Sequence, residues 1–289
     1  MTRHSLHTRA RSFACIATFA LVSLLFTRIS QAQTAQQTPA LDGIAHIAIR
    51  VHNLDASRDF YKKLGFDEAF ALSKNGAVYQ SFIKLDDRQF IELYPTTAKD
   101  SEIGFLHLCF ESDNLQAVYD DYIARDVHPN FKIRKAGAGN LLFTMKGPMQ
   151  ATGPQNIEYT QYMPGSRHYS DRGQHLGADR VGTKLVSVTL AMQDPAAARS
   201  FYLDKLKFTP DAHHPATFDL PGASGEQVEI VPLASLGSKG RITLATASLK
   251  TSAHLLKQAH VAFKKSRKSL TVKDPDGNLI VIEAREGVR

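Results

Sequence analysis

Cysteine is almost absent from this sequence of 289 residues. Of its two cysteines, Cys15 lies in an apolar run near the N-terminus, which leaves Cys109 alone in the rest of the chain. One cysteine cannot form an internal disulfide, so the fold is expected to be held by its hydrophobic core. The sequence also lacks a G-x-S-x-G motif, the usual mark of the nucleophilic serine of α/β-hydrolases.

Acidic side chains are missing from the first 32 residues. Basic residues are followed there by an uncharged, mostly apolar run over 13–26, and then by the small residues Ser30 and Ala32. This pattern is typical of a secretory signal peptide over residues 1–32, cleaved after Ala32. The run is shorter than the roughly 20 residues that a membrane span needs. We therefore expect an exported protein, periplasmic or extracellular and free of the membrane after cleavage, with an uncleaved anchor as the alternative.

A strong charge is also lacking once the signal peptide is set aside. The formal net charge of the chain is +7, and it falls to +3 without residues 1–32, which contain four arginines and no acid. An exported protein of such small charge gives no reason to expect nucleic-acid binding. The partner expected from the sequence is a small-molecule substrate.

What the sequence does contain is one pattern repeated four times. Each unit has an alternating strand, an amphipathic helix, two further strands and a closing strand. The opening strands are GIAHIAIRV (43–51), GFLHLCFES (104–112), TKLVSVTLAM (183–192) and GRITLATAS (240–248). The closing strands are QFIELYP (89–95), QNIEYTQYMPG (155–165), QVEIVPLA (227–234) and NLIVIEA (278–284).

A single βαβββ unit exposes one apolar sheet face, so the units are expected to pair. The first two units give a domain over residues 42–165, and the last two give a domain over residues 183–286. A flexible leader over 33–41 precedes them, and a glycine-rich polar linker over 166–182 joins them. The fold class predicted is α+β.

Tandem units with FYKKLGF (60–66), FIELYP (90–95) and DPDGN (274–278) resemble the vicinal oxygen chelate superfamily. That superfamily includes glyoxalase I, the extradiol ring-cleaving dioxygenases, methylmalonyl-CoA epimerase and the bleomycin-resistance proteins. The resemblance covers nearly all of the mature chain. It implies two tandem domains, each a curved, eight-stranded mixed sheet with flanking helices, and it is specific for the fold rather than for the reaction.

Two histidines and two glutamates occupy matching places in the first two units. His46 and His107 lie on the opening strands, and Glu92 and Glu158 lie on the closing strands. Strand alternation puts each of them on the face opposite the aliphatic residues. If the units pair with twofold symmetry, the four side chains converge, and such groups in an apolar cup are costly unless they are paired or bind a metal. We predict one divalent ion at this place: Zn, Ni, Co, Mn or Fe(II).

The resemblance identifies the same four residues as the ligand positions of the family. It also implies a degenerate second domain, because Ser187 and Thr243 stand at the histidine places and Val281 at the last ligand place. Only Glu229 is retained. The second domain is therefore expected to cover the first, to shape its pocket or to form a homodimer. In ring-cleaving dioxygenases the C-terminal domain is the catalytic one, so the order here is reversed.

Three neighbouring side chains, Arg50, Tyr94 and Tyr162, share the histidine and glutamate faces and are candidate substrate contacts, with packing around the site as the alternative. Cys109 points the same way and is interpreted as a small core residue.

Three functions remain open at this level. The first is a glyoxalase-like lyase or isomerase, in which the metal stabilises an enediolate and Glu158 or Glu92 carries the proton. The second is an Fe(II) extradiol dioxygenase, which needs only His46, His107 and Glu158. The third is a non-catalytic binding protein of the bleomycin-resistance type.

Overall fold

The structure, a computed structural model, describes residues 38–285. The predicted signal peptide, its cleavage site after Ala32 and residues 33–37 of the predicted leader lie outside the described residues. No helix within residues 38–285 has both the length and the apolar character needed to cross a bilayer.

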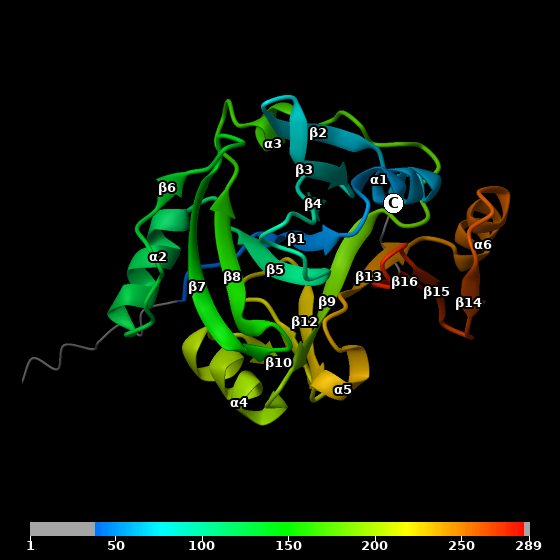
Figure 1. The fold of residues 1–289 in the computed structure, drawn as a ribbon. Coiled ribbons are helices and arrows are strands. Elements are labelled where there is room, and N and C mark those ends of the chain that lie inside the picture. Colours follow the sequence, from blue (N-terminus) through cyan, green and yellow to red (C-terminus); the bar gives the residue numbers. More distant parts are fainter. Residues whose placement is uncertain (1–37, 286–289) are drawn as a thin grey trace, which may run out of the picture. The chain divides into compact units, whose positions relative to one another are not determined.

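The first half of the described chain forms one eight-stranded mixed sheet, with strand order β2-β3-β4-β1-β5-β8-β7-β6 (Figure 1). The central strands β1 and β5 run antiparallel, while β4 and β8 run parallel to β1 and β5, respectively. Helix α2 packs on β7 and β8, and α1 contacts β4. The bounds are β1 Gly43–Val51, α1 Leu54–Lys63, β2 Glu68–Lys74, β3 Ala77–Lys84, β4 Phe90–Pro95, β5 Gly104–Glu111, α2 Leu115–Ala124, β6 Arg134–Lys135, β7 Leu141–Gln150, β8 Gly153–Gln161 and α3 Arg167–Ser170.

The second half repeats this topology in another eight-stranded sheet, with strand order β10-β11-β12-β9-β13-β16-β15-β14. The predicted α+β fold with two mixed sheets and flanking helices is confirmed. The bounds are β9 Lys184–Met192, α4 Pro195–Ser200, the π-helical turn η1 Phe201–Lys205, β10 Thr209–Pro210, β11 Thr217–Asp219, β12 Gln227–Pro232, α5 Leu233–Leu236, β13 Arg241–Thr246, α6 Leu249–Gln258, β14 Phe263–Lys265, β15 Ser269–Lys273 and β16 Leu279–Ala284.

Each unit's helix begins at a side-chain cap that follows the opening strand. The caps are Asn53, Asn114, Asp194 and Ser248, and each accepts a hydrogen bond from the backbone N–H three residues further on. These side chains satisfy backbone groups that the first helical turn leaves without a partner. The turn from strand to helix is thus encoded locally and in the same way in all four units.

The alternation of the strands separates two apolar clusters. One large buried cluster holds the outward aliphatic residues of both sheets, including Ile47 of β1 and Val188 of β9. A small second cluster lies on the other face of the first sheet and comprises Ala45, Leu72, Phe82, Phe90, Cys109, Ala138 and Tyr162. This second cluster surrounds the predicted metal ligands, so their surroundings are apolar.

Residues of the second half form hydrogen bonds with the starts of β1 and β4 in the first sheet. Gln89, just before β4, donates to the carbonyl of Leu185 over 2.9 Å and accepts from its N–H over 2.7 Å. Glu226 accepts a hydrogen bond from the backbone N–H of Ile44 in β1. Gly43 has φ of +152°, and a Cβ there would lie 2.7 Å from the Glu226 carboxylate. The start of β1 is thereby fitted to a carboxylate from the other half.

The segment that joins the two sheets is anchored by a buried ion pair. Lys84 at the end of β3 is fully buried, and its Nζ lies 2.7 Å from Oδ2 of Asp171, which follows helix α3. The same ammonium donates to the Asp171 carbonyl oxygen and lies 3.2 Å from the half-exposed Asp87. Because an unpaired ammonium is very costly in the protein interior, this pair fixes α3 against β3.

We expect Asp171→Ala to lower the free energy of unfolding by about 3 kcal/mol, because it leaves the Lys84 ammonium buried without its main partner. Urea unfolding followed by circular dichroism measures this. In the double variant Lys84→Met/Asp171→Ala no charge is left buried, so much of the loss should be recovered. Asp87→Ala is the matched control and should cost under about 1 kcal/mol, since Asp87 is half exposed. Equal losses in Asp171→Ala and the double variant would contradict this account.

Candidate metal centre

The four predicted ligands lie on four adjacent strands in the middle of the first sheet. Ala48 of β1 is paired with both Glu92 of β4 and His107 of β5, and His46 is two residues away on the same face. Glu158 of β8 is paired with Cys109 of β5. Residues on one face of neighbouring strands are close enough for their side chains to meet. The sheet register therefore brings together side chains that are separated by up to 112 positions in the sequence.

Three of these side chains form a compact group. His46 Nε2 lies 3.1 Å from His107 Nε2 and 3.6 Å from Glu158 Oε1. One donor atom from each of His46, His107 and Glu158 lies within 4.8 Å of the others. Two imidazoles and one carboxylate so placed form a donor set that suits a divalent transition metal.

Glu92 lies beside this group and is held by two hydrogen-bond donors. Its Oε2 accepts from Gln80 Nε2 over 2.7 Å and from the Tyr94 hydroxyl over 2.9 Å, and lies 3.9 Å from His107 Nε2. Its Oε1 lies 3.4 Å from Nδ1 of His46, a buried nitrogen that makes no hydrogen bond within the described residues. Glu92 can therefore reach a metal as a fourth ligand or orient the ring of His46 from behind.

Burial shifts the pKa of each of the four groups in the direction that favours its neutral form. Burial, with the Glu158 charge as the second cause, raises the pKa of Glu92 to about 8. Burial raises the pKa of Glu158 to about 7 and lowers that of His107 to about 4. The pKa of His46 is lowered well below its ordinary value by burial and by the neighbouring His107 and His168. A bound cation would reverse the penalty on the two carboxylates, so the residues fit a divalent ion.

A cavity of about 210 Å³ opens beside these groups. Glu92 and Glu158 line it together with Tyr94, and Leu72, Phe82 and Leu142 contribute apolar walls. Its mixed lining suits a small molecule that presents oxygens to the polar end.

The structure places the three predicted substrate contacts differently from one another. Tyr94 lines the cavity and bonds to Glu92. Tyr162 is buried behind the cavity, where its ring stacks on His168. Arg50 lies outside the lining and pairs with Asp100 at 3.5 Å. Cys109 is fully buried among the ligands and lies 3.5 Å from Glu158 Oε1.

His168 is the site residue that sequence reasoning missed, because it lies in the expected linker. It is buried and lines the same cavity, and its ring centroid lies 4.3 Å from that of Tyr162. Within the described residues neither of its ring nitrogens has a hydrogen-bond partner. Burial lowers its pKa to about 3, so it is a neutral imidazole, in which one ring nitrogen is a donor and the other an acceptor. No periodic pattern in the sequence indicates that this residue is buried. The only available signal is its position as an isolated histidine shortly after a closing strand.

The second sheet carries an ion pair at the corresponding place. Thr189 of β9 pairs with Glu229 and Arg241, as Ala48 pairs with Glu92 and His107. The register thus puts Arg241 at the place of His107, whereas the sequence pattern had suggested Thr243. Arg241 Nη2 bonds to Glu229 Oε2, and both side chains contact the hydroxyl of Thr189. Ser187 and Val281 do stand at the places of His46 and Glu158. A guanidinium thus balances the one carboxylate that the second sheet retains.

The comparisons with known proteins give a sequence match in the first half of the chain. The sequence profile of the Glyoxalase/Bleomycin resistance protein/Dioxygenase superfamily matches residues 43–154. This range contains His46, Glu92 and His107 and ends just before Glu158. No curated protein matches the chain significantly.

Solved structures share the fold over both halves. The Mn(II)-bound glyoxalase from Novosphingobium aromaticivorans is 14% identical, with a TM-score of 0.64 over 85% of this chain and 82% of that one. The 2,3-dioxygenase LapB from Pseudomonas sp. KL28 is 13% identical, with a TM-score of 0.60 over 87% and 95%. An extradiol ring-cleaving dioxygenase from B. fuscum is 15% identical, with a TM-score of 0.61 over 87% and 74%.

At this identity the likeness establishes the fold alone, and it leaves the metal and the reaction open. The sequence match adds that residues 43–154 are similar to a domain of the glyoxalase/bleomycin resistance protein/dioxygenase superfamily.

Proposed function

We propose that this protein is a metal-dependent lyase or isomerase that acts on a small substrate with two neighbouring oxygens. It would bind one divalent ion through His46, His107 and Glu158, with Glu92 as the fourth group. The observation that carries this proposal is the convergence of two carboxylates from two different units, the buried Glu92 and the partly buried Glu158, on two imidazoles. A structure that needed only packing at this place would have no use for four polar groups on an apolar face.

A divalent ion held here would act as a Lewis acid toward the substrate oxygens. The side chains around it can manage the proton. Among residues 38–285, only the His46 ring lies close to Oε1 of Glu92, while Tyr94 and Gln80 hold Oε2 in place. The unblocked Oε1 oxygen would let Glu92 take a proton from carbon and return it at a neighbouring carbon.

The apolar walls of the cavity define the kind of substrate. Leu72, Phe82 and Leu142 favour a compact molecule with one apolar side. His168 lies against Phe82, with their ring centroids 5.1 Å apart, and adds a neutral imidazole to the lining. The cavity volume of about 210 Å³ excludes large conjugates from being enclosed entirely.

A second candidate, an Fe(II) ring-cleaving dioxygenase, is favoured by one feature of the site. The compact group contains two histidines and one carboxylate, and Glu92 lies outside it, facing His46 Nδ1 rather than Nε2. That arrangement leaves open positions on one side of an iron ion. The two candidates therefore differ in what Glu92 does.

The metal ligands can be tested by elemental analysis and calorimetric titration with Mn²⁺, Ni²⁺ and Zn²⁺. We expect one ion per chain, and we expect His46→Ala and His107→Ala each to weaken its affinity by more than about 100-fold. Arg241→Ala is the matched control from the second sheet and should leave both stoichiometry and affinity unchanged. A wild-type protein that binds none of these ions, with Fe²⁺ also tested without oxygen, would refute the metal site.

The reaction class can be tested with the variant Glu92→Gln. In a lyase or isomerase, Glu92→Gln should keep most of its metal affinity and lose at least about 100-fold in the rate of proton exchange at carbon. The exchange is followed by NMR in D₂O with a panel of small hydroxycarbonyl compounds. Oxygen uptake with catechols by the Fe²⁺-loaded protein, unaffected by Glu92→Gln, would favour the dioxygenase. Metal binding with neither activity over both panels would count against both.

The pH dependence of stability tests the buried carboxyls. Because the folded-state pKa values of Glu92 and Glu158 are raised, their contribution is present at low pH and is lost as the pH rises through about 7 to 8. The lowered pKa values of His46 and His107 act only below the ordinary value of 6.5. Between pH 6.5 and 8.5 we therefore expect the metal-free protein to lose about 2 kcal/mol of unfolding free energy.

Urea unfolding in the presence of a chelator measures this slope. The double variant Glu92→Gln/Glu158→Gln should show a much flatter profile over the same range. Excess divalent metal should reverse the trend, since metal binds the deprotonated carboxylates. A slope that is the same in the wild type and the double variant would show that other groups cause it.

A further inference from the structure

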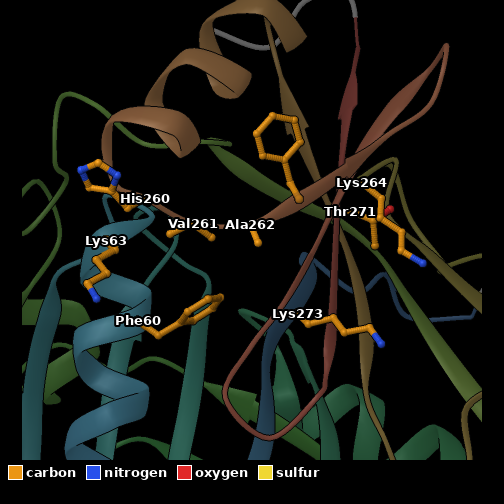
Figure 2. A pocket seen from close by; sticks show the side chains of 9 residues that line it. Phe60, Lys63, His260, Val261, Ala262, Lys264, Thr271 and Lys273 are labelled. Atoms are coloured by element: carbon orange, nitrogen blue, oxygen red, sulfur yellow. The ribbon is translucent and has the colours of Figure 1, made fainter.

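A second pocket lies between helix α1 and the hairpin of β14 and β15. Its volume is about 430 Å³, and its lining includes Phe60 and Lys63 of α1, Val261, Phe263 and Lys264 near β14, and Lys273 at the end of β15. Figure 2 shows Lys63 and His260 on one side and Lys264 and Lys273 on the other, with Val261 and Ala262 between them. None of the proposed metal ligands lines it.

The floor of this pocket is apolar and rests on the core. Phe60, Val261 and Phe263 are partly buried, and all three pack against the large hydrophobic cluster. Such a floor keeps its shape when the pocket is empty or filled, because the residues below it are closely packed. Apolar surface that stays partly exposed in this way can be covered by a ligand.

The rim carries positive charge that the rest of the structure does not neutralise. Lys63, Lys264 and Lys273 are exposed, and none of them forms an ion pair with any residue in 38–285. The cations lie on both sides of one cavity, so their fields add inside it. An anion entering the pocket would be attracted from both sides.

We propose that this pocket is a binding site for a small organic anion with an apolar body, such as an alkyl or aryl carboxylate or sulfonate. The body would cover Phe60, Val261 and Phe263, and the anionic group would lie between the lysine ammonium groups of Lys264 and Lys273. The volume is within the range of about 300–1,000 Å³ that small-molecule sites have. This site is separate from the metal centre and does not depend on the function proposed above.

The fluorescent probe anilinonaphthalene sulfonate (ANS), an apolar anion, tests the site directly with the full chain. We expect saturable binding to one site, with the same affinity in the presence and absence of a chelator. The charge-reversed variant Lys264→Glu/Lys273→Glu should weaken the affinity by about tenfold or more.

The matched control is Lys265→Glu/Lys268→Glu, which changes the net charge equally. Lys265 and Lys268 are both exposed, and neither lines the pocket. This variant should bind ANS within about twofold of the wild type. Octanoate should displace the probe, whereas acetate, which lacks the apolar body, and octanol, which lacks the charge, should not.

Two results would overturn the proposal. Equal weakening in both double variants would mean that the probe responds to overall charge. Loss of ANS binding in His107→Ala, or displacement of ANS by metal, would place the probe in the metal centre instead. Thermal unfolding of each variant checks that the fold is intact, which is expected because all four substituted lysines are exposed.

Discussion

Two carboxylates and two imidazoles within an apolar cup are the constraint on which the first half of this protein depends. Each of these groups is costly to bury in its charged form, and burial accordingly raises the pKa values of the two carboxyls and lowers those of the two imidazoles. The surrounding structure holds them in place against that cost. Tyr94 and Gln80 hold Glu92, and Glu226, just before β12, holds the start of β1. The Lys84–Asp171 pair holds α3 beside the cavity.

The repeat made most of this arrangement predictable. Alternation assigned His46, Glu92, His107 and Glu158 to one face, and the pairing of βαβββ units implied that the four would meet. The strand and helix content of each unit followed from the same pattern, because period is a local property that recurs in each unit. The two eight-stranded sheets were implied by the resemblance to the superfamily. The four side chains do come together in the structure.

Two features could not be predicted from the sequence: the place of Arg241, which depends on strand register, and the burial of His168, which lies in an irregular segment. Aligning the opening strands by their first glycines puts Thr243 at the place of His107, but pairing with β9 shifts the frame by two residues and puts Arg241 there. The strands contain register shifts that no side-chain pattern records. His168 escaped because a polar segment with several glycines has no periodicity from which burial can be read.

Because of Arg241, the two halves differ in where the positive charge that balances their carboxylates comes from. In the second sheet the positive charge that balances Glu229 belongs to a side chain of the same polypeptide, so the charge balance there requires no bound ion. In the first sheet the same balance, if a metal supplies it, must be drawn from the medium. The second half would then reach its charge balance by folding alone, whereas the first half would reach it only where a metal ion is present.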